Sequence, residues 1–157
     1  MSGPKLIEGD PNAHGRRVAI VAAKFNDFIV TSLLKGAEEA WRTHGGAPGE
    51  LLIARVPGAF ELPVAVRALA VTRRYDAIVA LGCVIRGDTP HFDYVAGECA
   101  RGLQDVGLET GVPVAFGVLT VESVEQAQER ARTTGMNKGG EAMLTALEMA
   151  GLLSRLA

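Results

Sequence analysis

Four short apolar runs recur along the chain, at residues 17–23, 51–56, 77–82 and 113–119. Each run is nearly continuous rather than alternating, which is typical of strands covered on both faces in a parallel sheet. The segments between the runs carry apolar residues at helical spacing, and two further helical segments follow the last run, with a break at residues 135–137. This order predicts a three-layer α/β/α sandwich with a four-stranded parallel sheet, which is a flavodoxin-like fold.

The pattern of strands and helices continues without a linker or a low-complexity tract. We therefore expect residues 17–157 to form a single domain, preceded by an N-terminal extension of residues 1–16. With 157 residues, of which 48% are hydrophobic and 22% charged, the chain is long enough for one well-filled core.

Charge and composition exclude several classes of function. The formal net charge is -2, so no general basic field is present to hold nucleic acid or an anionic membrane surface. No stretch reaches the ~18 apolar residues of a membrane span, and the N-terminus lacks the apolar core of a signal peptide. Cys83 and Cys99 are expected to be reduced thiols, as in a cytoplasmic protein. His14, His44 and His91 lie far apart, which argues against a metal site.

A polar stretch directly follows the third apolar run. Ligands of open α/β sheets bind beyond the carboxyl ends of the strands, and the sequence there reads GCVIRGDTPHFDYV, residues 82–95. Thr89 has the chemistry of an N-cap, and Pro90 is favoured at the first helical position. Such a turn presents N–H groups and the positive end of a helix dipole to an anion such as phosphate. His91 would lie in the first turn as a neutral base. A plain capped turn with an exposed histidine is the alternative.

Aromatic residues mark the other strand ends. Phe25 is expected at the end of the first strand, Phe60 follows the Pro57-Gly58 break after the second, and Phe116 is expected at the end of the fourth. We expect these three side chains at one edge of the sheet, where a flat heteroaromatic ligand would use them for stacking. Chance clustering is the alternative.

Two cations flank the glycine-containing break near the C-terminus. Arg130 and Lys138 offer a second place for phosphate, although solvated surface charges are the alternative. The stretch NKGG lacks the glycine spacing of a Walker loop, and no GxGxxG follows a strand, so no nucleotide cofactor is indicated. Lys24 and Cys83 lack a local activating group and are interpreted as structural.

Six blocks of sequence agree with one family in order and spacing. FNDFI, VPGAFELP, YDAIVALGCVIRGDTPHFDYV, FGVLT, EQAQERA and NKGGEA resemble the 6,7-dimethyl-8-ribityllumazine synthase family of riboflavin biosynthesis. The resemblance runs from about Arg17 to the C-terminus. It implies condensation of 5-amino-6-(D-ribitylamino)uracil with 3,4-dihydroxy-2-butanone 4-phosphate, without a metal or a cofactor. It also implies a homo-oligomer, either a pentamer or a shell of twelve pentamers, with riboflavin synthase as a further partner.

The resemblance implies a role for each matching residue. The residues that would stack on the pyrimidine, hold its ribityl chain and read its ring edge are Phe25, Ala59, Phe60, Glu61, Cys83, Val84 and Ile85. Those that would hold the phosphate and transfer protons are Asp88, Thr89 and His91. Those that would come from a neighbouring subunit are Phe116, Arg130 and Lys138.

Two residues depart from the family pattern. Many relatives carry a lysine in place of Thr134 and a smaller uncharged residue in place of Asp88. A carboxylate beside a phosphate is unfavourable unless Arg86, Arg130 or Lys138 offsets it, or only its N–H is used. Two other functions stay open: a flavodoxin-like phosphosugar or nucleotide enzyme, and a flavin-binding or shell-forming protein that has lost the chemistry.

Overall fold

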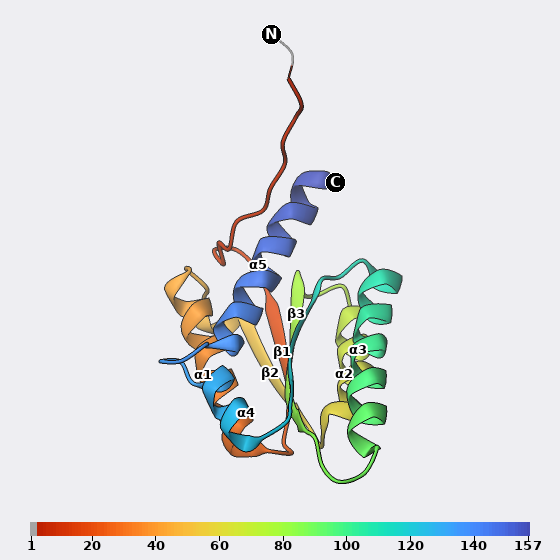
Figure 1. Cartoon of the computed structure of the whole chain (residues 1–157). Helices are drawn as coiled ribbons and strands as arrows, with labels where there is room; N and C mark the ends of the chain where they lie inside the picture. The colour runs from red at the N-terminus through yellow and green to blue at the C-terminus, as the bar shows by residue number, and fades with distance from the viewer. Residues whose placement is uncertain (1–2) are drawn as a thin grey trace.

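The computed structural model describes residues 3–157. Its sheet has four parallel strands in the order β2-β1-β3-β4 (Figure 1). The strands are β1 (Val18–Ala23), β2 (Leu51–Val56), β3 (Ala77–Ile85) and β4 (Val114–Val121). One face is covered by α1 (Asp27–Thr43), α4 (Val124–Ala131) and α5 (Lys138–Leu156), and the other by α2 (Leu62–Ala70) and α3 (His91–Thr110). The predicted α/β/α sandwich is confirmed.

Burial along the strands follows their place in the sheet. The two central strands, β1 and β3, are buried at every position except Ile85. The prediction that residues 51–56 are also covered on both faces is wrong, because β2 is an edge strand and Leu52 and Ile53 are each 38% exposed. The helices contact β1, β3 and β4 more than they contact β2, so β2 keeps part of its apolar surface uncovered.

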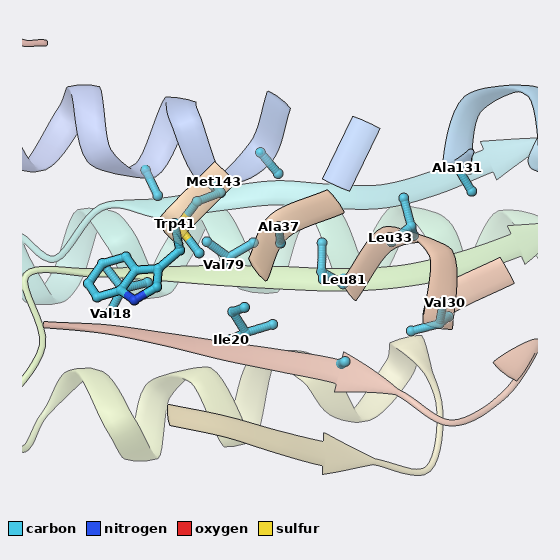
Figure 2. Packing of buried hydrophobic residues seen from close by; sticks show 14 of the residues in the cluster. Val18, Ile20, Val30, Leu33, Ala37, Trp41, Val79, Leu81, Ala131 and Met143 are labelled. Carbon is cyan, nitrogen blue, oxygen red and sulfur yellow. The ribbon is translucent and has the colours of Figure 1, made fainter. Parts of the chain in front are cut away.

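One of the two apolar clusters lies between the sheet and α1, α4 and α5 (Figure 2). A close contact between α1 and α5 explains one glycine of the NKGG stretch: a Cβ added to Gly139 would lie 2.0 Å from the backbone oxygen of Leu33. Asn137 precedes α5 with φ of 47°, and its side chain accepts a hydrogen bond from the Gly140 N–H. This stretch therefore serves helix packing and capping.

The segment ahead of β1 extends away from the sheet beside the C-terminal part of α5 (Figure 1). Arg155 donates hydrogen bonds to the Glu8 carbonyl and, at 3.2 Å, to the Asp10 carboxylate. These contacts belong to the predicted N-terminal extension, of which residues 1–2 lie outside the described part. Within residues 3–157, no helix has the length and apolar character needed to cross a membrane.

One inner strand, β3, and one edge strand, β4, run further than the sequence pattern predicts. β3 continues to Ile85 and β4 to Val121, past the expected ends at residues 82 and 119. β1 pairs with β3 only as far as Leu81, whereas β4 stays paired with it up to Ile85. The end of β3 therefore projects beyond β1 and forms one wall of an open space at the carboxyl end of the sheet.

Candidate active site

A cavity of about 710 Å³ opens at the carboxyl ends of β1, β2 and β3. It brings together most of the residues that sequence analysis assigned to one chain. Those that line it are Phe25, Ala59, Phe60, Glu61, Cys83, Val84, Ile85, Thr89 and His91. These residues meet because they lie at or shortly after the ends of β1, β2 and β3, and parallel strands end at the same edge of the sheet.

Two phenylalanine rings stand exposed in this cavity. Phe25 is 70% exposed and Phe60 is 58% exposed. The N–H groups of Lys24 and Phe25 donate to the carbonyls of Val56 and Pro57, so the backbone beyond β1 is held against the end of β2. Phe60 lies in the single 3-10 turn Ala59–Glu61 that leads into α2. Exposed rings on a fixed backbone are suited to stack on a flat ligand.

Asn26 organises the junction between the first and third strands. It has a left-handed backbone, with φ of 60°, and its Nδ2 donates a hydrogen bond of 2.9 Å to the carbonyl of Cys83. Sequence analysis did not identify this residue. The local signal was an asparagine directly before a helix, because asparagine tolerates the left-handed region.

The end of β3 presents backbone groups to the cavity. The N–H groups of Ile78 and Arg86 donate toward β4, to Pro113 and Val121. Because N–H and C=O groups alternate in direction along a strand, those of Ile85 face the opposite side, where β1 has already ended. Within the described chain, β1 therefore does not pair with the backbone N–H and C=O of Ile85, and these groups are placed to bind the polar edge of a ligand ring.

Cys83 lines the cavity but is poorly suited to act as a nucleophile. Its side chain is buried, and this burial raises the pKa of the thiol to about 11. The thiolate is the nucleophilic form, so the group stays inactive at neutral pH. This supports the structural interpretation made from the sequence.

The anion turn, residues 87–90, differs in one detail from the prediction. The helix α3 begins at His91, so Pro90 stands at the N-cap and Thr89 lies one residue further out. The Thr89 hydroxyl accepts a long hydrogen bond of 3.4 Å from the His91 N–H, which keeps the capping chemistry from the shifted position. A Cβ added to Gly87 would meet no atom within 4 Å among the described residues. Packing within the chain therefore does not require a glycine there.

The two charged residues at the anion turn, Arg86 and Asp88, have different surroundings. Asp88 is exposed, and the part of the cavity lining that the structure describes passes from Gly87 to Thr89 without it. Arg86 pairs instead with Glu122, at 2.9 Å, and with Asp93, at 3.5 Å. It is therefore not available to offset the charge of Asp88.

A second cavity, of about 290 Å³, contains Phe116, Arg130 and Lys138. It lies between β4, α4 and α5, and within residues 3–157 it shares no lining residue with the first cavity. Lys138 pairs with Glu141 at 3.0 Å, and Arg130 donates to the carbonyl of Gln126 at 3.2 Å. The two predicted cations thus lie beside one aromatic ring, apart from His91.

The predicted position of Phe116 is wrong. The residue is not at the carboxyl end of β4 but opposite Ala80 in the middle of the sheet, with its side chain 48% exposed on the edge strand. Ala80 precedes Ile85 by five strand positions, which is roughly 16 Å along the chain at ~3.3 Å per residue. The reason is that Thr120 and Val121 continue the pairing with β3. Phe116 therefore does not join Phe25 and Phe60 within one chain.

Metal ligands are not gathered in the described part of the chain. Residues 3–157 contain no group of three or more histidine, cysteine, aspartate or glutamate side chains that could hold an ion. His44 lies at the end of α1, where its Nδ1 contacts the Ala40 carbonyl at 2.9 Å, and His14 lies in the segment ahead of β1.

A comparison with protein families gives one match that covers both cavities. The sequence model of 6,7-dimethyl-8-ribityllumazine synthase matches residues 15–154 of the 157-residue chain.

Proposed function

We propose that this chain, which belongs to the 6,7-dimethyl-8-ribityllumazine synthase family, condenses 5-amino-6-(D-ribitylamino)uracil with 3,4-dihydroxy-2-butanone 4-phosphate. The family consists of transferases of riboflavin biosynthesis, so the chain is an enzyme of that pathway. The choice of substrates and products, namely the lumazine, phosphate and water, is our proposal. The observation that carries it is the cavity in which exposed aromatic rings, free strand-end backbone and an anion turn with His91 meet.

The aromatic side of the cavity fits the pyrimidine. Phe25 would stack on the ring, and the backbone of Cys83, Val84 and Ile85 would bind its polar edge. The backbone groups of Ile85 support this role because they face the cavity beyond the end of β1. The turn Ala59–Glu61 would hold the ribityl chain, with the Glu61 carboxylate accepting from its hydroxyl groups.

The turn before α3 fits the phosphate of the four-carbon substrate. Thr89 would donate its hydroxyl, and the backbone of Gly87 and Asp88 would approach the anion closely. The space around Gly87 supports this, since no atom of residues 3–157 lies within 4 Å of a Cβ added there. The exposed Asp88 side chain would point away from the phosphate, so that only its N–H takes part.

The reaction needs proton transfers rather than a strong nucleophile. An imine forms between the 5-amino group and the ketone with loss of water, and elimination of phosphate then leaves an enol that becomes a new carbonyl group. The ribitylamino nitrogen attacks this carbonyl and closes the second ring with loss of a second water. His91 would move the protons, for which a poised imidazole contributes roughly 10²- to 10⁴-fold. Positioning of the two substrates would supply most of the remaining rate. None of these three steps, imine formation, phosphate elimination and ring closure, requires a metal or a cofactor.

Two copies of the chain would build each complete site. Among the described residues, Phe116, Arg130 and Lys138 line a different cavity from His91. A neighbouring copy would bring its second cavity against the first. The edge strand β2, whose Leu52 and Ile53 are partly uncovered, is in keeping with association of several copies. We propose a cytoplasmic homopentamer, or a shell of twelve pentamers, with riboflavin synthase as a further partner.

The direct test is steady-state turnover by the purified chain with the two named substrates. Lumazine absorbance and phosphate release are expected to rise together, with and without a chelator. Loss of activity with chelator and recovery with added metal would contradict the mechanism. Binding of the pyrimidine without any turnover would instead favour a binding protein that has lost the chemistry.

A further inference from the structure

We propose that Arg86 is a positioning residue, which holds the anion turn, residues 87–90, and the first turn of α3 in the orientation that lets Thr89 and His91 face the cavity. This inference rests on the proposed function for its kinetic consequences. The contacts on which it is built do not depend on the substrates.

Arg86 joins three parts of the fold at the point where β3 ends. Its N–H donates to the Val121 carbonyl at 2.9 Å, which fixes its backbone to β4. Its Nε donates to Glu122, which directly follows β4, at 2.9 Å, and its Nη1 donates to Asp93 in the first turn of α3 at 3.5 Å. The guanidinium carbon lies 4.3 Å from the centre of the Phe92 ring. A planar, forked cation is suited to hold all three at once.

The anion turn has little else to hold it. Within the described chain, Gly87, Asp88 and Thr89 make no backbone–backbone hydrogen bond. The turn is tied at one end by the Arg86 backbone and at the other by α3, whose first turn carries Asp93 and Phe92. Its orientation therefore depends on how α3 is fixed relative to β4, and the Arg86 side chain makes that connection.

The guanidinium is not placed to bind phosphate itself. Two carboxylates already flank it, and Arg86 is not among the described residues that line the cavity, whereas its contact Phe92 is. The hydrogen bond that Arg86 donates to Glu122, more than the nearby charges, raises the pKa of Arg86 above its usual value, so the group stays charged. An arginine in this setting would act on the substrate through the turn and not directly.

The effect is expected in kinetics rather than in stability. Exposed ion pairs contribute little to folding, so Arg86→Gln should keep a wild-type Tm. A misplaced turn, however, should lower kcat/KM for the phosphate substrate by roughly ten- to a hundredfold, as small displacements of catalytic groups do. The KM of the pyrimidine should hardly change, because Phe25 and the turn Ala59–Glu61 are not touched.

The experiment compares Arg86→Gln, Arg86→Lys and Glu122→Gln with the control Arg101→Gln. Arg101 also pairs with two carboxylates, Glu98 and Asp105, but on the outer side of α3. Steady-state kinetics for both substrates, oligomer mass and amide hydrogen exchange of residues 87–93 are measured for each variant. A positioning role predicts that Glu122→Gln lowers kcat/KM for the phosphate substrate as much as Arg86→Gln does, and that Arg86→Lys keeps little of the wild-type kcat/KM. The double variant Arg86→Gln, Glu122→Gln should have a kcat/KM no lower than that of either single variant.

Direct phosphate binding predicts the opposite pattern. Glu122→Gln would then free the guanidinium and leave KM for the phosphate substrate unchanged or lower, and Arg86→Lys would retain most activity. Either result would overturn the proposal. If the wild-type chain makes no lumazine, the proposed function fails. Hydrogen exchange then decides by itself whether Arg86 holds the anion turn in place. Within residues 87–93, the amides of His91 and Asp93 donate to Thr89 and Pro90. Exchange of these two amides that is faster by about tenfold in Arg86→Gln and Glu122→Gln, but not in Arg101→Gln, supports the positioning role. Unchanged exchange refutes it.

Discussion

Phe116 lies opposite Ala80 in the sheet, several strand positions before the turn that carries His91. The two cavities of the proposed site are consequently separate: one holds the aromatic rings and the anion turn, and the other holds Phe116 and two cations. Neither cavity alone contains all the groups that the proposed condensation uses. A second copy is the simplest source of the missing half, because the same chain carries both halves.

Removal of Arg130 tests the second cavity. Arg130→Ala should raise KM for the phosphate substrate by roughly ten- to a hundredfold, the cost of one charge-assisted hydrogen bond. KM for the pyrimidine should change far less. The matched control is Arg132→Ala, since Arg132 lies just after α4 but pairs with Glu129 outside this cavity. Equal effects of Arg130→Ala on both substrates would exclude the phosphate role.

Asp88 should weaken binding of the phosphate substrate through its charge. Its side chain is exposed, and Arg86 is paired elsewhere, so within the described chain no guanidinium pairs with it. Asp88→Asn should therefore lower KM for the phosphate substrate by about fivefold or less, which is the size of a charge interaction in water at short range. The gain should shrink as salt is added, because screening removes it. A rise in KM would mean that the carboxylate helps to hold the substrate.

The features of the candidate site whose placement in the fold could be predicted from the sequence are local. The order of the strand end, Gly87, Thr89 and His91 can be read from neighbouring residues, since a strand end and a helix start define such a turn. The position of Phe116 could not, because the length of β4 is set by its pairing with β3. Contacts such as Asn26 with Cys83, or Arg86 with Glu122, join residues 57 and 36 positions apart. No periodicity reports such pairs, so they appear only in the folded chain.

Replacement by alanine should change the free energy of unfolding in opposite directions at two helix glycines, Gly139 and Gly97. Gly139→Ala would place a methyl group 2.0 Å from the Leu33 backbone oxygen, so α1 and α5 must separate. It should lower the free energy of unfolding by about 1–3 kcal/mol, the usual cost of overpacking. Gly97 in α3 has no atom of the described residues within 4 Å of an added Cβ. Gly97→Ala should raise that free energy by up to about 1 kcal/mol. Urea denaturation measures both, and a stable Gly139→Ala would contradict the tight contact.

The two thiols should resist alkylation in the folded chain. Burial raises the pKa of Cys83 and of Cys99 from 9.0 to about 11, so the native state holds these protons more tightly than the unfolded state. The free energy of unfolding should therefore fall as pH rises from 9 toward 11. This fall should be smaller in a Cys83→Ala, Cys99→Ala double variant than in the wild type. Iodoacetamide at neutral pH should label both residues in urea but neither in buffer. Equal labelling rates in the two solutions would show that the thiols are accessible.

Complementation between two inactive variants tests the shared site most directly. Phe116→Ala and His91→Ala are coexpressed with different tags, and mixing is confirmed by native mass. In a random equal mixture, about a quarter of the sites combine an intact His91 with an intact Phe116 from a neighbour, so activity should approach a quarter of the wild-type value. The matched control mixes Phe116→Ala with Arg130→Ala, which damages the same half in every chain and should show no gain. A mixture that stays at the average of its two parents would place the whole site within one chain and contradict the account.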